Sequence, residues 1–305
     1  MSTRNNKLLV ILGPTASGKS DLAVKIAKKY NGEVISADSR QVYKGMDIGS
    51  GKITKKEMLG MPHHLLDVAS PKKRFTVAQF QKLARKEIRK IWKNGKIPIL
   101  CGGTGLYIQS IVDGLVIPEV PPDAKLRAKL EKFSTEELFK KLKKLDPRRA
   151  ENIDRHNRRR LIRSLEIIIK TGQPMPTAGS RTRQSLPRTD LDRLNILQLG
   201  IAQPGEKLKK LINKRLHKRL KQGMIAEVKK LRQSGISWKR LEEFGLEYRA
   251  IALYLQNKIS KQEMIDKIQL ESEQYAKRQM TWFKRDKRIN WIKNYKEAKK
   301  LAKSF

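Results

Sequence analysis

The sequence predicts an α/β fold built on a parallel sheet, because short apolar runs that end at glycine or aspartate alternate with stretches of helical periodicity. The first run, Leu8–Leu12, stops at Gly13 and is followed by an amphipathic helix at Lys19–Tyr30. Glu33–Ala37 is then expected to form a second buried strand that ends at Asp38. Strand, helix and strand make a βαβ unit, whose two strands run parallel and end at the same edge of the sheet.

The same alternation continues further along the chain. Helical periodicity over Val77–Lys93 leads into another expected strand, Ile97–Leu100, which runs into a second cluster of glycines. Leu194–Ile201 is expected to rejoin the sheet, and beyond residue 204 the pattern is almost wholly helical. One of these expected helices, Lys261–Lys284, is long and basic.

Between these parts the composition changes, which indicates an inserted helical domain. Prolines are followed there by two strongly basic helical segments, expected at Asp123–Lys144 and Asn157–Lys170. Thr171–Arg188 is rich in glycine and proline and is expected to be a long polar loop. The predicted division is residues 1–115 for the first part of the core, 116–190 for the inserted helical domain, and 191–305 for the completion of the core and a basic helical C-terminal region.

The charge of the chain predicts a polyanionic partner. Lys and Arg number 69 against 30 Asp and Glu, so the formal net charge is +39. Because this excess is spread along the whole chain, a disordered basic tail does not explain it. Nucleic acid is favoured over an anionic membrane surface as the partner. The apolar run at Lys7–Leu12 is too short to span a bilayer and leads into a glycine loop, so neither a signal peptide nor a transmembrane helix is expected.

Cysteine usage fits a reducing cytoplasm. Cys101 is the single cysteine, which excludes a disulfide framework or a multi-cysteine metal site within one chain. We expect this thiol to be packed rather than reactive, because it follows apolar Leu100 with no base nearby in sequence. The adjacent His63 and His64 cannot easily face one metal ion, and we interpret them as structural.

The glycine loop after the first strand predicts a phosphate-binding site. It matches the pattern G-x-x-x-x-G-K-[ST] between a strand and a helix, where backbone N–H groups and the helix N-terminus face an anion. Lys19 supplies charge and Ser20 can ligate Mg²⁺, the expected cofactor. The loop alone leaves open whether it holds a nucleoside triphosphate or another diphosphate. The residues expected to bind a diphosphate are Gly13, Pro14, Thr15, Ala16, Ser17, Gly18, Lys19 and Ser20.

Two further loops are expected to meet this one at the carboxyl edge of the sheet. Asp38 follows the second strand and could bind a metal or accept a proton, although an aspartate that only caps a turn is also common there. The glycines at 102, 103 and 105 surround Thr104, whose hydroxyl would lie on the same rim. Convergence of three loops at one edge favours a functional site over a set of tight turns.

Taken together, these segments resemble the tRNA dimethylallyltransferases, in order along nearly the whole chain. The resembling segments are Gly13–Ser20, Asp38–Tyr43, Gly45–Gly49, Pro62–Asp67, Gly102–Tyr107 and Lys277–Trp282. The resemblance implies a P-loop, nucleotide-kinase-like core with an inserted helical domain. It also implies transfer of a dimethylallyl group from dimethylallyl diphosphate to N6 of the adenosine 3′-adjacent to the anticodon in tRNA, with release of diphosphate. The eukaryotic zinc finger cannot be built with Cys101 alone, so the bacterial-type form, acting as a monomer in the cytoplasm, is expected.

The resemblance also assigns roles to individual residues. Asp38 would be the general base, Thr104 would bridge towards the substrate, and Arg215 would face the diphosphate. The anticodon stem-loop of tRNA would contact Asp38, Ser39, Arg40, Gln41, Thr104, Arg127, Arg159, Arg160, Arg163, Tyr248, Arg249, Lys277, Arg278 and Gln279. The segment Phe244–Arg249 departs from the usual glycine–tyrosine pair of the family.

Three rival functions remain. An adenylate isopentenyltransferase would use the same donor on free adenine nucleotides, but a small acceptor does not require a charge of +39. A P-loop kinase acting on a small metabolite fits the loop but not the basic helices. A non-enzymatic RNA-binding module would not need an intact phosphate loop.

Overall fold

The computed structural model describes residues 6–176 and 194–305. Over these residues the core sheet has six strands, all parallel, which confirms the predicted α/β class. The strands are β1 Lys7–Leu12, β2 Gly32–Ala37, β3 His63–His64, β4 Ile97–Gly102, β5 Asn195–Ile201 and β6 Ile289–Ile292, in the order β3-β2-β4-β1-β5-β6. The first strand therefore lies inside the sheet, between β4 and β5.

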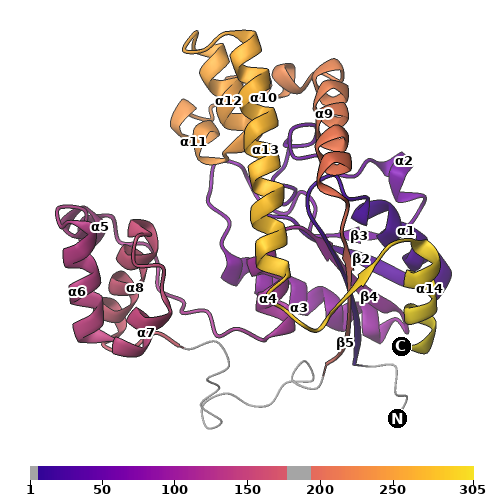
Figure 1. Cartoon of the computed structure of the whole chain (residues 1–305), viewed down its shortest axis with the longest axis horizontal. Coiled ribbons are helices and arrows are strands. Elements are labelled where there is room, and N and C mark those ends of the chain that lie inside the picture. The colour runs from indigo at the N-terminus through magenta and orange to yellow at the C-terminus, as the bar shows by residue number, and fades with distance from the viewer. Residues whose placement is uncertain (1–5, 177–193) are drawn as a thin grey trace. The chain divides into compact units, whose positions relative to one another are not determined.

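Helices cover both faces of this sheet (Figure 1). α1 (Lys19–Tyr30) and α14 (Tyr295–Ser304) lie on one face, and α3 (Val77–Lys93) and α4 (Gly105–Val112) lie on the other. Because successive strand residues point to opposite faces, the apolar run of β1 serves two cores. Leu8, Val10 and Leu12 pack with Phe80 of α3, whereas Leu9 and Ile11 pack with Leu22 and Ile26 of α1.

The C-terminal helices stand beyond the carboxyl ends of the strands, over the phosphate loop (Figure 1). They are α9 Gly205–Lys221, α10 Met224–Gln233, α11 Trp238–Glu243, α12 Leu246–Leu255 and α13 Lys261–Phe283. Short α2 (Lys55–Met58) lies in the connection between β2 and β3. α13 starts at a capping box formed by Ser260 and Glu263.

Residues 113–187 form a separate compact unit, and residues 1–112 and 188–305 form the other. The helices of the unit at residues 113–187 are α5 Ala124–Leu130, α6 Thr135–Leu145, α7 Pro147–Asn152 and α8 Arg158–Thr171. Leu138, Leu142 and Leu161 are fully buried in its own apolar core. The predicted boundary at residue 190 and most of the loop expected at Thr171–Arg188 lie outside the described residues.

The elements differ from the expected ones in detail. The helical segment expected at Asp123–Lys144 is divided into two helices, because the Ser134 hydroxyl and the Glu137 carboxylate form a capping box that starts a new helix. The C-terminal region is almost wholly helical, as expected, and also contains one short strand, β6, over the described residues. The expected end of the β4 strand at Leu100 falls two residues short, since pairing with β1 and β2 continues to Gly102.

Candidate active site

The phosphate loop, Gly13–Ser20, connects β1 to α1, as the sequence pattern requires. Gly18, at φ 89°, is the N-cap residue of α1, and no side chain among the described residues caps this helix. The first backbone N–H groups of α1 are therefore left to bind an anion. A Cβ atom at Gly13 would lie 2.7 Å from the carbonyl oxygen of Ile201, so only glycine lets β1 turn this close to β5.

One hydroxyl in this loop is left without a partner. The Oγ atom of Ser17 is buried and has no hydrogen-bond partner in the part of the chain that the structure describes. A buried hydroxyl without a partner costs about 1–3 kcal/mol. An anion bound in the loop would accept a hydrogen bond from this hydroxyl and remove that cost.

Thr15 is held by two residues from distant helices. Its backbone N–H donates to Oε1 of Gln279 on α13 at 2.8 Å, and its hydroxyl accepts a hydrogen bond from Arg215 on α9. Among the residues expected to bind a diphosphate, Thr15 therefore has both its backbone N–H and its hydroxyl hydrogen-bonded within the protein. The Thr15 N–H already has an acceptor, so it does not face a ligand in this arrangement.

Two partly buried cations, Lys19 and Arg215, lie at the loop without enough negative charge to balance them. Burial lowers the pKa of Lys19, and the charge of Arg215 lowers it further, although Asp38 acts in the opposite direction. Burial, together with Arg219 one helical turn away, also lowers the pKa of Arg215. The Lys19 ammonium donates to the Pro14 carbonyl at 3.1 Å. A bound polyanion would stabilise these charged forms.

Asp38 caps a turn, and it also lines the cavity described below. Its Oδ1 atom accepts from the backbone N–H groups of Arg40 at 2.8 Å and Gln41 at 3.3 Å, which is the turn-capping role. Since both turn bonds use Oδ1, the other oxygen, Oδ2, is the one placed to accept a proton.

Thr104 joins the second glycine loop to Asp38. Its Oγ1 atom accepts from the backbone N–H of Ser39 at 3.0 Å, and its N–H donates to the carbonyl of Ala37 at 3.2 Å. The glycines around it are required by close packing. A Cβ atom at Gly102 would clash with the backbone of Ala37, and one at Gly105 would lie 2.5 Å from the Trp282 ring on α13.

A cavity of about 430 Å³ is lined by Thr15, by residues 38–40 and by residues of α9, α12 and α13, whereas Thr104 is not among its lining residues. The predicted catalytic residues Asp38 and Arg215 line it together, so the structure brings them to one site. Its wall also includes Thr15, Arg219, Tyr275 and Arg278. Burial together with the nearby Asp38 carboxylate raises the pKa of Tyr275 to about 12, although the neighbouring Thr104 hydroxyl acts to lower it.

Two residues expected to contact tRNA instead hold the loops around the cavity. The Arg40 Nε donates to the Phe244 carbonyl at 2.7 Å, and the Gln41 amide donates to the Gly51 carbonyl at 3.1 Å. Both side chains remain partly accessible, and Arg40 lines the cavity beside Ser39.

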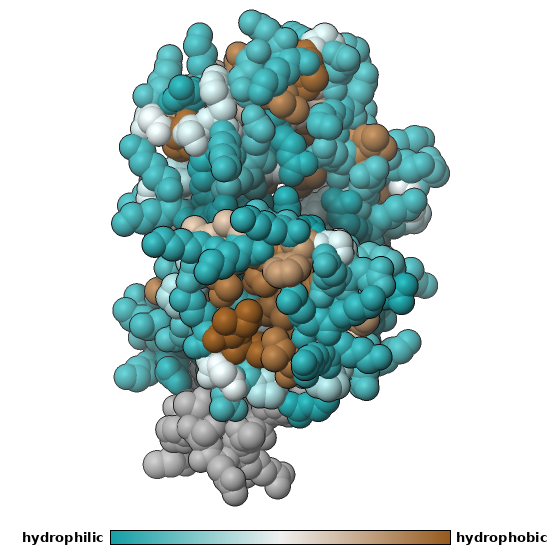
Figure 2. All heavy atoms as spheres, turned by 90° about the vertical axis from the view of Figure 1, so that its left-hand side faces the viewer, coloured by the Kyte–Doolittle hydropathy of each residue, from teal (hydrophilic) through white to brown (hydrophobic). Residues whose placement is uncertain are grey.

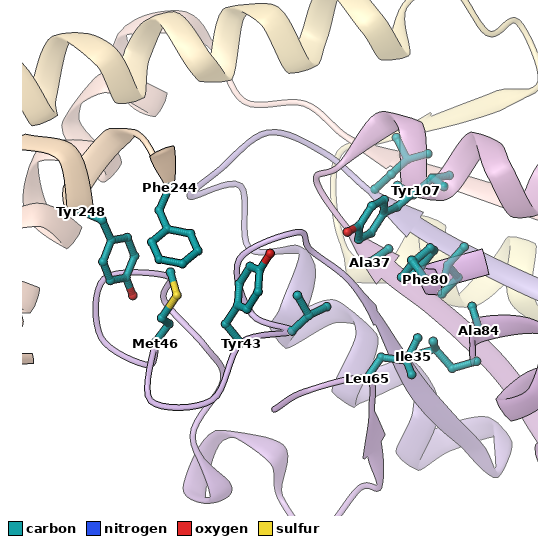
Figure 3. Close-up of a cluster of buried hydrophobic side chains, with 14 of the residues drawn as sticks. Ile35, Ala37, Tyr43, Met46, Leu65, Phe80, Ala84, Tyr107, Phe244 and Tyr248 are labelled. Carbon is teal, nitrogen blue, oxygen red and sulfur yellow. The ribbon is translucent and has the colours of Figure 1, made fainter. Parts of the chain in front are cut away.

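Tyr248, a residue expected to contact tRNA, lines the cavity but is almost fully buried. It is 1% exposed, and its hydroxyl donates to the Glu227 carboxylate at 2.9 Å. Its ring packs edge-on against Phe244, which in turn meets Tyr43 at 5.1 Å between ring centroids. Figure 3 shows the three rings together with Met46 in one apolar cluster. Tyr248 therefore anchors α12 to the core.

Gln279 also differs from its expected role, because it is 6% exposed and hydrogen-bonded inside the protein. Its neighbours Lys277 and Arg278 are exposed, so one helix places charge outward and an amide inward. Arg249 is 47% exposed at its side chain and lies 4.0 Å from Glu271.

In the inserted unit, a buried carboxylate organises two of the expected tRNA-binding arginines. Glu166 is fully buried and accepts two hydrogen bonds from Arg127, both at 2.7 Å, and one from Arg163 at 2.5 Å. Burial acts to raise the pKa of Glu166, but these hydrogen bonds, with Arg127 contributing most, hold it at about 2. Arg159 and Arg160 are exposed on the same helix.

Several site residues escaped the sequence analysis. Arg219 is 8% exposed and bonds to Gly49 and Glu247, yet in sequence it looks like one more basic residue of a solvated helix. Glu227 accepts from the backbone N–H groups of residues 47, 48 and 49 and so fixes the loop beside the cavity. The period of four residues between Arg215 and Arg219 on α9 is the signal that could have revealed the pair.

The expectations for the cysteine and histidines hold. Cys101 is buried, and burial raises the pKa of its thiol to about 12. His64 lies between the carboxylates of Glu33 at 2.7 Å and Glu87 at 3.1 Å, so it links β2, β3 and α3. Its place in this ion-pair network is structural.

The face of the molecule in Figure 2 is mostly hydrophilic, with one prominent hydrophobic area and smaller hydrophobic spots elsewhere. Over the described residues, no helix has both the length and the apolar character needed to cross a membrane. The same residues contain no group of three or more His, Cys, Asp or Glu side chains able to hold a metal ion.

Comparison with known proteins identifies the family. The sequence pattern described as IPP transferase matches residues 41–286. A tRNA dimethylallyltransferase from Carboxydothermus hydrogenoformans is 43% identical over 298 residues, which cover 96% of this chain and 94% of the relative.

Solved structures agree with this match. The full-length tRNA isopentenylpyrophosphate transferase from Bacillus halodurans has a TM-score of 0.71 at 37% identity, over 98% of this chain and 95% of that one. A eukaryotic dimethylallyltransferase acting on tRNA has a TM-score of 0.74 at 29% identity, over 91% of this chain and 69% of that one. With its phosphate loop, its cavity and these relatives, the chain belongs to the IPP transferase family, that of the tRNA dimethylallyltransferases.

Proposed function

We propose that this protein transfers a dimethylallyl group from dimethylallyl diphosphate to N6 of the adenosine 3′-adjacent to the anticodon in tRNA. The observation that carries the proposal is one cavity shared by an anion-binding end and a carboxylate. Arg215 and Arg219 lie at the first and Asp38 at the second. This arrangement matches a reaction in which a diphosphate leaves while an amine loses a proton.

The acceptor chemistry falls to Asp38. An exocyclic aromatic amine is a weak nucleophile, so a carboxylate that removes its proton as the new bond forms lowers the barrier. N6 bonds to C1 of the dimethylallyl group, the N6 proton passes to Asp38, and no covalent enzyme intermediate is needed. Thr104, fixed to Ser39 beside this carboxylate, sets where the acceptor can sit.

The leaving-group chemistry falls to the phosphate loop. As the bond between C1 and oxygen breaks, its electron pair moves onto the diphosphate. Lys19, Arg215 and the N-terminal N–H groups of α1 stabilise that charge. Because these groups are partly buried and already in place, little reorganisation is required during the reaction.

Mg²⁺ fits this site only as a partner of the diphosphate. Ser20 would be its protein ligand, and Mg²⁺ usually relies on one or two protein ligands together with phosphate oxygens and water. The described residues offer no carboxylate cluster for an all-protein site. When bound, the ion would neutralise charge on the diphosphate.

Purified protein tests the proposal in the presence of Mg²⁺, dimethylallyl diphosphate and an unmodified anticodon stem-loop. The expected product is RNA heavier by one C5 unit, located at the target adenosine by mass spectrometry of fragments. A stem-loop with guanosine at that position, which has no N6 amine, is the matched control. Prenylation of free AMP at a comparable rate would instead indicate an adenylate isopentenyltransferase, and phosphate transfer from ATP would indicate a kinase.

A further inference from the structure

Gln279 occupies a position between the two glycine loops of the site. Its Oε1 atom accepts from the Thr15 N–H at 2.8 Å, and its Nε2 atom donates to the Gly103 carbonyl at 2.8 Å. One planar amide therefore connects the phosphate loop to the loop that carries Thr104. The two loops are separated in sequence by almost 90 residues, and Gln279 follows them by more than 170.

The surroundings leave the amide little freedom. Gln279 is 6% exposed, and a Cβ atom at Gly103 would clash with its Nε2 atom. Trp282, one turn further along α13, packs against Gly105 of the same loop. Tyr275, one turn earlier, lies close enough to Thr104 for the threonine hydroxyl to influence its pKa. This face of α13 is thus fitted to the second glycine loop over two turns.

We propose that Gln279 is a positioning residue that sets the distance between the diphosphate loop and the acceptor side of the cavity. This inference rests on the proposed function. Because the Oε1 atom of Gln279 accepts from the Thr15 N–H, this N–H is not available to a phosphate oxygen, unlike the other N–H groups of the loop. Gln279 thereby sets the position of one end of the diphosphate. By holding the Gly103 carbonyl, it fixes the start of the turn that carries Thr104.

The amide is suited to this task because it both accepts and donates. A carboxylate at this position could accept from the Thr15 N–H, but it could not donate to the Gly103 carbonyl. It would also place a negative charge beside the diphosphate. Gln279→Glu therefore keeps the shape of the side chain but loses the hydrogen bond to the Gly103 carbonyl, whereas Gln279→Ala removes both hydrogen bonds.

Two binding measurements and one kinetic measurement test the inference on the full chain. Inorganic diphosphate with Mg²⁺ is titrated by calorimetry, the unmodified stem-loop by fluorescence anisotropy, and single-turnover transfer is followed with dimethylallyl diphosphate. For Gln279→Ala we expect about 10-fold weaker diphosphate binding and slower transfer, with stem-loop affinity within about 3-fold of wild type. Gln279→Glu should weaken diphosphate binding further. Gln262→Ala, an exposed glutamine on the same helix, should leave all three measurements unchanged.

Gly103→Ala supplies an independent test, because the added methyl group would displace the Gln279 amide without changing it chemically. This variant should reproduce the loss seen in Gln279→Ala. The double variant should be no worse than the worse single variant, since both substitutions remove the same connection.

Two outcomes would overturn the inference. The first is wild-type diphosphate affinity and transfer rate in both single variants. The second is a loss confined to stem-loop affinity, which would make Gln279 a tRNA contact after all. Failure of the proposed function is a separate result: wild-type protein would then yield no prenylated RNA, while diphosphate titration would still report on Gln279.

Discussion

At the scale of the residue, the site depends on side chains that each meet two demands. The clearest is Asp38, which caps a turn with Oδ1 and lines the cavity. An asparagine keeps an oxygen for the turn but cannot serve as a base. The turn and the chemistry can therefore be separated by one substitution.

We expect Asp38→Asn to slow the single-turnover chemical step by about 10²–10⁴-fold, because the proton acceptor is lost. Stem-loop affinity should stay within a small factor of wild type, since Arg40 and Gln41 keep their turn. Rapid-quench kinetics with saturating stem-loop and donor measures the first quantity, and anisotropy measures the second. An unchanged chemical step would assign Asp38 to the turn alone.

Arg215 gives the second prediction at this scale. Its partly buried guanidinium bonds to Thr15 and lacks a carboxylate partner at bonding distance among its described contacts. Adding inorganic diphosphate and Mg²⁺ should therefore raise the thermal midpoint of the protein by binding the folded state. In Arg215→Gln this rise should shrink at the same ligand concentration. Equal rises in both proteins would place the anion elsewhere.

At the scale of the element, several strands and helices of the core could be predicted, because their own sequences carry the apolar pattern of a strand or a helix. The βαβ unit, the phosphate loop and the helices α1 and α3 follow directly from apolar periodicity and glycine positions. β6 could not be predicted, because four residues between lysine-rich segments gain their strand geometry only by pairing with β5. Such tertiary pairing leaves no local pattern.

The site shows the same division between local and tertiary information. Asp38 and Thr104 could be predicted, since both follow strands that end at one edge of the sheet. The burial of Arg219 and Gln279 could not be predicted. The local sequence of a basic helix does not show whether a polar residue faces solvent or packs against a glycine loop. Tyr248 shows the converse, as its role in the core depends on Glu227 from another helix.

The Glu166 cluster carries the prediction that belongs to this scale. The pKa of Glu166 is about 2 in the folded unit, below the value of about 4.3 for an unfolded carboxyl. Its contribution to stability is therefore full above pH about 4.5 and is lost as the pH falls towards 2. The difference corresponds to about 3 kcal/mol.

We expect Glu166→Gln to speed hydrogen exchange in α8 at pH 7, and to differ less from wild type as the pH is lowered. Exchange read by mass spectrometry suits the unit, because all four tryptophans of the chain lie outside residues 113–187. Glu136→Gln, an exposed carboxylate on α6, should have little effect at any pH. A gap between wild type and Glu166→Gln that is constant with pH would contradict the electrostatic origin.

At the scale of the whole molecule, the net charge of +39 governs association with RNA. Each phosphate contact releases counterions, so affinity falls steeply with salt. The structure divides the expected contacts into exposed arginines, such as Arg159 and Arg160, and arginines already bonded to Glu166.

We expect the double variant Arg159→Ala and Arg160→Ala to weaken stem-loop binding and to flatten the plot of log affinity against log salt by about one unit per lost contact. Diphosphate binding, measured in parallel, should not change. A salt dependence equal to that of wild type would show that these side chains face away from the RNA.

The position of β1 inside the sheet has a consequence for synthesis on the ribosome. β1 leaves the ribosome before its two neighbours in the sheet, β4 and β5, which begin at residues 97 and 195. Until both have left the exit tunnel, an apolar strand waits with unpaired edges, a state prone to aggregation. Residues 113–187 have an apolar core of their own, so they can fold during this interval. The cavity, whose walls include α9 and α13, can form only after both helices have been synthesised.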